Sequence, residues 1–71
     1  MLFRSVKFEL VRTLDLRGLR GEAYLLTNTS DRQVVMDERD LYRDGVQAVS
    51  IEKLVLEAGD STAVYVLSEG E

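Results

Sequence analysis

The chain has 71 residues and a net charge of −4, with 45% hydrophobic and 31% charged residues and neither cysteine nor histidine. This length suits one small domain, and the composition is globular rather than disordered. The missing cysteine and histidine exclude disulfides, thiol chemistry and any catalytic site that needs an imidazole. The acidic balance argues against direct nucleic-acid binding, which needs clustered Lys and Arg.

The first part of the chain has the alternation of a half-buried strand. From Arg4 to Leu16 the even positions are apolar except for the two arginines, and this period predicts a strand whose Val6, Phe8 and Leu10 side chains point inward. The glycines and arginines at positions 17–21 are expected to form the loop that ends this strand.

A second β-rich run extends from Glu22 to Asn28, and its adjacent Leu25 and Leu26 predict burial on both faces of the strand. The short polar side chains of residues 28–31 then predict a turn, because such side chains bond their own backbone. Gln33 to Asp37 is expected to form a short strand.

The segment Glu38 to Tyr42 fits either a single helical turn or a bent strand. The Asp44-Gly45 pair predicts a turn, since glycine adopts positive φ without steric cost. Alternation resumes over Val46 to Leu56, and after a turn at residues 58–60 the run Thr62 to Leu67 completes the pattern. Short strands at this spacing predict an all-β fold, a small antiparallel β-sandwich (Ig-like) or partly open barrel of five to seven strands, spanning residues 1–71 as one domain.

The densest charge cluster lies at residues 37–44. Several carboxylates in one loop are compatible with a calcium or magnesium site, but Arg39 and Arg43 would compete with the cation, and the spacing differs from that of an EF-hand. Glu38 and Asp40 are candidates for acid–base work, yet nothing in the pattern predicts a pocket that would shift a pKa. The serines and threonines have no base to activate them. We therefore expect no enzyme, no metal and no cofactor.

Two further patterns bear on binding. Phe8 is expected to lie in the core, while Tyr24 and Tyr65 fill the sandwich and place their hydroxyls at its rim. An open sandwich also has edge strands, whose unpaired N–H and C=O groups can accept an extended segment of another chain.

Several weak motifs occur together in a fixed order between Val6 and Leu67. They are Tyr24-Leu25-Leu26-Thr27-Asn28, Leu41-Tyr42 followed by Gly45-Val46-Gln47-Ala48-Val49-Ser50, and Val64-Tyr65-Val66. In this order and spacing the chain resembles the C-terminal domain of the TraK family, the secretin-like outer-membrane component of F-type conjugative type IV secretion systems.

This resemblance implies a periplasmic β-sandwich in a ring-shaped core complex associated with the outer membrane through its partners. Those partners would be a small TraV-like lipoprotein and a TraB-like scaffold protein. It further implies docking of an extended lipoprotein segment on the β-sandwich, as in the related VirB-type systems. We expect Tyr24, Tyr42, Tyr65, Val6 and Phe8 to be partner-binding residues. The alternative is a free-standing ligand- or cation-binding β-domain that uses the acidic loop at residues 37–44.

The N-terminal sequence Met1-Leu2-Phe3-Arg4 lacks the apolar region of a signal peptide, and no stretch reaches the length of a transmembrane helix. The ring-forming N-terminal portion of the TraK family has no counterpart in the chain. We therefore expect an excised C-terminal domain of a longer periplasmic protein.

Overall fold

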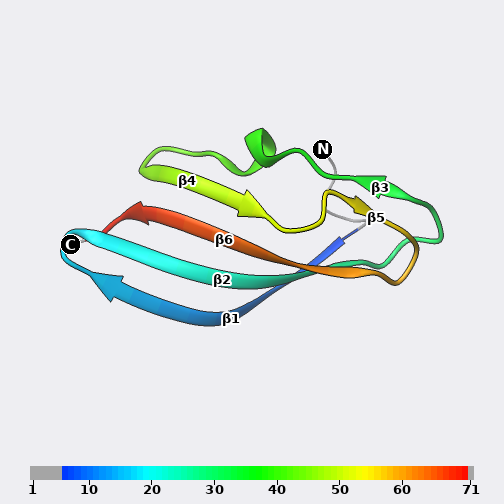
Figure 1. Cartoon of the computed structure of the whole chain (residues 1–71), viewed down its shortest axis with the longest axis horizontal. Helices are drawn as coiled ribbons and strands as arrows, with labels where there is room; N and C mark the ends of the chain where they lie inside the picture. The colour runs from blue at the N-terminus through cyan, green and yellow to red at the C-terminus, as the bar shows by residue number, and fades with distance from the viewer. Residues whose placement is uncertain (1–5, 71) are drawn as a thin grey trace.

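A computed structural model describes residues 6–70 and confirms the all-β fold (Figure 1). Arg4 and Ser5 of the predicted first strand lie outside these residues. The described chain forms the elements β1 (Val6–Leu16), β2 (Leu19–Asn28), β3 (Val34–Val35), the 3₁₀ helix η2 (Glu38–Leu41), β4 (Val46–Ile51), β5 (Val55–Leu56) and β6 (Ser61–Glu69). One antiparallel sheet has the order β1-β2-β6-β4, and β3 pairs with β5 in a second sheet. The sheets do not close into a barrel.

The core lies between one face of the four-stranded sheet and the layer formed by β3, β5 and η2. This inner face and the covering layer bury Val6, Leu26, Met36, Leu41, Val49, Ile51, Leu56 and Val64. Alternation in the strands places the buried strand residues on the inner face and their sequence neighbours on the outer face. In Figure 1 the short strands β3 and β5 lie at one end of the long sheet, so the inner face at the other end has less cover.

A β-bulge interrupts β1. Leu10 pairs with Tyr24 but Arg12 pairs with Ala23, so Val11 is an extra residue on β1. Beyond the bulge the side chains change faces, and Leu14 points to the outer face of the sheet. Leu10 lies on the inner face as predicted, but it is exposed rather than covered, because it sits on an edge strand beyond the reach of the small second layer.

Three further details differ from the sequence prediction. The connection between the first two strands is only the Arg17–Gly18 turn, with Gly18 at φ 66°, and Arg20 and Gly21 belong to β2. Leu26 is buried, whereas Leu25 is exposed, since no described residue covers the outer face. The predicted strand from Val46 to Leu56 is divided into β4 and β5, which belong to different sheets.

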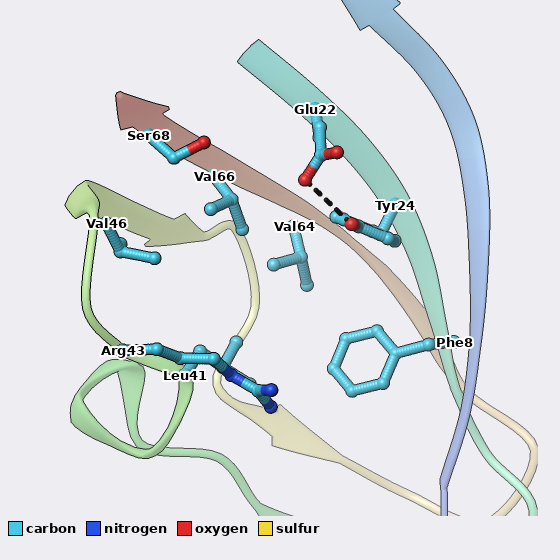
Figure 2. Close-up of a pocket in the computed structure, with 9 residues that line it drawn as sticks. All are labelled: Phe8, Glu22, Tyr24, Leu41, Arg43, Val46, Val64, Val66 and Ser68. Carbon is cyan, nitrogen blue, oxygen red and sulfur yellow. Dashed lines mark hydrogen bonds between the residues drawn. The ribbon is translucent and has the colours of Figure 1, made fainter. Parts of the chain in front are cut away.

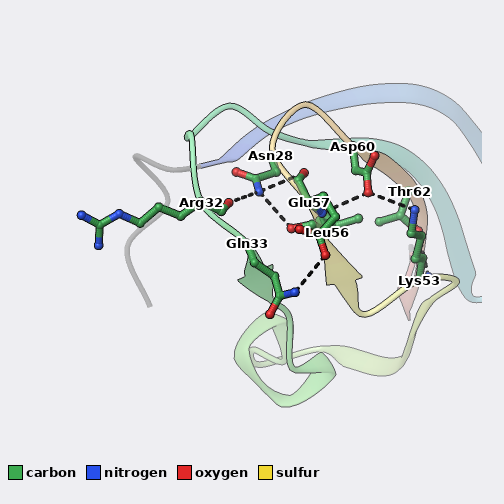
Figure 3. Close-up of polar contacts among 8 residues, drawn as sticks. All are labelled: Asn28, Arg32, Gln33, Lys53, Leu56, Glu57, Asp60 and Thr62. Atoms are coloured by element: carbon green, nitrogen blue, oxygen red, sulfur yellow. Dashed lines mark hydrogen bonds and ion pairs between the residues drawn. The ribbon is translucent and has the colours of Figure 1, made fainter.

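Asn28 confirms the predicted turn and extends it into a buried network (Figure 3). Its side chain is fully buried, and its Nδ2 donates to the carbonyl oxygens of Arg32, Leu56 and Glu57 at 2.6, 3.0 and 3.1 Å. Its Oδ1 accepts hydrogen bonds from the N–H and the hydroxyl of Ser30 at 2.9 and 2.7 Å. One side chain therefore joins the end of β2, the following loop and β5.

Asp60 holds the turn between β5 and β6. Its carboxylate accepts the Glu57 N–H at 3.0 Å and contacts the Lys53 ammonium at 3.1 Å. The hydrogen bond from the Glu57 N–H, and then the one from Lys53, lower the pKa of Asp60 from its ordinary value.

Asp60 is expected to contribute to the pH dependence of stability. Because its folded pKa lies below its unfolded pKa, the stabilisation is present above the unfolded pKa and is lost as pH falls through the folded pKa. Asp60→Asn should therefore lose less stability on acidification than the parent chain does. Urea unfolding at a series of acidic pH values measures this loss, with the exposed Asp31→Asn as the matched control. An unchanged acid dependence in Asp60→Asn would contradict the assignment.

Candidate functional site

An open groove of about 410 Å³ lies on the inner face of the four-stranded sheet (Figure 2). One side is formed by β1, and the opposite side by η2, the following loop and the start of β4. The strands β2 and β6 form the floor between them. Its lining residues are the apolar or aromatic Phe8, Tyr24, Leu41, Val46, Val64 and Val66 and the polar Glu22, Arg43 and Ser68. The groove is therefore a mostly apolar surface with a few polar groups at fixed places, which is typical of a binding site.

The aromatic side of the groove is held in place by two contacts. The rings of Phe8 and Tyr24 meet edge to face, with centroids 5.9 Å apart and planes at 79°. The Tyr24 hydroxyl donates to the Glu22 carboxylate at 2.8 Å. Partial burial, and then this hydrogen bond, raise the pKa of Tyr24 from its ordinary value. Two ordered rings provide contact area at low entropic cost to a partner.

Arg43 supplies positive charge on the opposite side. It lies in the loop between η2 and β4, and Figure 2 shows its guanidinium reaching toward the middle of the groove. Within residues 6–70 no carboxylate lies within ion-pair distance of Arg43. The groove thus combines an apolar floor with a cation that can pair with an acidic group of a ligand.

The β4 edge of the sheet is blocked by side chains of the η2 segment. The Val49 N–H donates to the Tyr42 hydroxyl at 3.3 Å, and the Ile51 N–H donates to the Glu38 carboxylate at 2.9 Å. Of the two structures that the sequence allows for Glu38 to Tyr42, the segment therefore forms mainly the helical turn, η2. The side chains of Glu38 and Tyr42 accept hydrogen bonds from backbone N–H groups at the free edge of β4. These donors are not available to an added strand.

Removal of the Glu38 carboxylate is expected to expose this edge. Glu38→Ala should lower the free energy of unfolding by about 1–2 kcal/mol, because the Ile51 N–H loses a charge-assisted partner. Amide exchange at Ile51 should accelerate, as measured by NMR. Asp40→Ala on the same turn is the control, since the Asp40 side chain is exposed. Equal effects of the two variants would show that Glu38 does not cap the edge.

The structure separates the five predicted partner-binding residues. Phe8 and Tyr24 meet in the groove, where they contact one another. Val6 is buried in the core at 7% exposure. Tyr42 lies beside β4. The prediction that Tyr65 fills the sandwich is wrong, because Tyr65 pairs with Ala23 at an outward position and projects from the outer face with 44% exposure.

Other lining residues of the groove were absent from the predicted set. Val64 and Val66 follow from the inward alternation of the last strand, and this signal was available in the sequence. Leu41 and Arg43 reach the groove only because η2 folds back over the sheet, and no local pattern indicates that contact. Arg43 follows Tyr42 in the sequence, but their adjacency does not reveal which side chain faces the sheet.

Two carboxylates of the acidic loop at residues 37–44 have separate partners within the chain, since Glu38 accepts the Ile51 N–H and Asp37 contacts Arg39. Asp37 accepts the Arg39 N–H at 2.9 Å as the N-cap of η2 and forms an ion pair with the Arg39 guanidinium at 2.8 Å. The side-chain hydrogen bond from Arg39, and then the backbone one, lower the pKa of Asp37. Across residues 6–70 no group of three or more acidic, His or Cys side chains is arranged to hold a metal ion.

Comparison with known protein families shows to which family the chain belongs. The sequence model described as the TraK C-terminal domain matches residues 2–68. The chain belongs to this family. A search of curated proteins found no match. Family membership supports a role in conjugation and type IV secretion, and it agrees with the β-rich fold. Among residues 6–70 there is no helix long and apolar enough to cross a membrane.

Proposed function

We propose that this TraK C-terminal domain is a protein-interaction module of an outer-membrane core complex in the periplasm. In this proposal it is not an enzyme, and its groove holds an extended segment of a TraV-like lipoprotein. Contact with a TraB-like scaffold and association with the outer membrane would then come from the assembled complex. The observation that carries the proposal is the open apolar groove with its ordered Phe8–Tyr24 pair.

An extended segment suits the shape of this surface. The small second layer leaves part of the inner face under less cover, and a segment lying there would add to that layer. Side chains on one side of an extended segment would pack on Val64, Val66 and the two rings, and the burial of apolar area would supply most of the affinity. The β4 edge, by contrast, has donors already bonded to Tyr42 and Glu38.

Arg43 gives the segment a preferred chemistry. A cation at the side of an apolar groove favours an acidic group in the partner, and such a pair would fix the register of the segment. Glu22 on the other side is already bonded to Tyr24, so its charge is partly satisfied within the chain.

Charge reversal at Arg43 tests the proposal. Arg43→Glu should weaken binding of a peptide from the TraV-like lipoprotein by about tenfold or more, because the attraction becomes a repulsion. Isothermal titration calorimetry measures the change. Arg17→Glu, in the exposed β1–β2 turn, alters the net charge equally and should leave affinity nearly unchanged. Equal losses in the two variants would mean that only net charge matters and would contradict docking in the groove.

A further inference from the structure

The β1 edge differs from the β4 edge in having no cover within the described residues. β1 is the outer strand of its sheet, and no described strand or helix lies beside its free edge. Near its centre Leu10 and Val11 are 55% and 67% exposed. An exposed apolar edge strand invites pairing with another strand.

The direction of the free backbone groups follows from the neighbouring strand. The Asn28 N–H and C=O bond to Asp60 and Gly59, on the β6 side of β2. Asn28 lies opposite Val6, so this cross-strand pair is of the non-hydrogen-bonded kind. Val6 therefore directs its N–H and C=O away from β2, and by alternation so does Leu10. Beyond the extra residue at the bulge, Thr13 does the same, because it lies opposite Glu22.

The bulge gives β1 a two-fold pattern about Leu10. Val11 is the extra residue and has no partner on β2, so Arg12 is the first paired residue after Leu10, just as Glu9 is the first paired residue before it. Both side chains point to the outer face of the sheet. If two copies of β1 run antiparallel with Leu10 opposite Leu10, each Glu9 faces the Arg12 of the other copy, and each Lys7 faces a Leu14.

We propose that two copies of this chain pair through their β1 edges, in the register centred on Leu10. The pairing joins the two four-stranded sheets into one continuous sheet, buries both Leu10 side chains and forms two Glu9–Arg12 pairs. Within residues 6–70 Arg12 has no carboxylate within ion-pair distance, and Glu9 meets only Lys7 at 3.6 Å. Arg12 is therefore available, and Glu9 is held only by an exposed ion pair with Lys7. The complementarity of Glu9 and Arg12 under a two-fold axis selects a second copy as the occupant. This interface is separate from the groove and goes beyond the proposed function.

A charge-exchange series tests the interface. The parent chain should sediment at high concentration with twice the 8.0 kDa mass of one chain. Glu9→Arg and Arg12→Glu should each weaken dimerisation by about tenfold or more, since two attractive pairs become two repulsive pairs. Mixing the two single variants, or combining both changes in one chain, restores opposite charges and should restore the dimer. This rescue separates a specific pair from a loss of folding.

Cross-linking tests the register. The chain has no cysteine, so Lys7→Cys and Leu14→Cys each introduce a single thiol. In the proposed register positions 7 and 14 of different copies form a non-hydrogen-bonded pair with Cα atoms about 4.5 Å apart, which suits a disulfide. Oxidation of a mixture should therefore yield mixed dimers in excess over either homodimer. A register centred on Phe8 would instead place Lys7 opposite Glu9 and give no such excess.

Three results would overturn the proposal. The chain could remain monomeric at all concentrations, the charge exchange could fail to restore the dimer, or the mixed disulfide could fail to predominate. Protection of the β1 amides by the lipoprotein peptide in a monomeric chain would assign this edge to that partner instead. The Arg43→Glu titration is independent of all these outcomes, so failure of the dimer and failure of the groove can be distinguished.

Discussion

Replacement of Asn28 by Ala is expected to destabilise the chain by about 3 kcal/mol, which would be a large share of the stability of so small a domain. The buried amide group donates to three carbonyl oxygens and accepts two hydrogen bonds from Ser30. Alanine would remove all five bonds and leave buried groups without partners. Because the network joins β2 to β5, its loss should also loosen the second layer over the core.

Thermal and urea unfolding measure this effect. The melting temperature of Asn28→Ala should fall by more than about 10 °C, given the sensitivity of small domains. Asn28→Asp should be similarly harmful, since a carboxylate has no N–H to donate to the three carbonyls. Gln47→Ala is the control, because its side chain is exposed and makes one 3.3 Å hydrogen bond, to Glu69. A loss below about 1 kcal/mol for Asn28→Ala would show that solvent replaces the network.

Replacement of Tyr24 by Ala should cause the largest loss of lipoprotein binding, about 30-fold or more. Its ring packs on Phe8 at the side of the groove, and buried aromatic anchors commonly contribute 2 kcal/mol or more to an interface. The loss should appear mainly as faster dissociation, since the ring does not steer the encounter. Tyr24→Phe should retain most of the affinity if the ring rather than the hydroxyl makes the contact.

Tyr65→Ala is the matched control for Tyr24→Ala. Tyr65 lies on the adjacent strand β6, but its side chain projects from the opposite face of the same sheet. Surface plasmon resonance of the immobilised peptide, with each variant checked for folding by circular dichroism, compares the two. If Tyr65→Ala weakens binding as strongly as Tyr24→Ala does, the partner contacts the outer face and the assignment to the groove is wrong.

Much of the fold could be predicted because strand alternation is local. The inward position of Val6 follows from period two, and the structure confirms that it is buried. Val49, Ile51 and Val64 lie at alternate positions of the later strands and are buried as well. The bulge at Val11 could not be predicted in this way. It depends on which residue of β2 lies opposite, and a single extra residue reverses the outward and inward sets beyond it.

The same distinction holds for the candidate site. Phe8 and Tyr24 lie on predicted strands, and their proximity follows once β1 and β2 pair as a hairpin. Arg43 and Leu41 reach the groove through η2, whose position depends on Glu38 and Tyr42 bonding to the edge of β4. These contacts join segments that the linear pattern treats separately. The groove therefore emerges from tertiary packing, which propensity and periodicity do not encode.

The most direct test of docking in the groove is an amide-shift titration of the isotopically labelled chain with a peptide from the TraV-like lipoprotein. We expect saturable shifts at residues that line the groove, above all Tyr24, Arg43, Val64 and Val66. The outer-face residues Ala63 and Tyr65 should change less, although they alternate with Val64 and Val66 on the same strand. Saturable shifts centred on the outer face, or no shifts at high peptide concentration, would contradict lipoprotein docking in this groove.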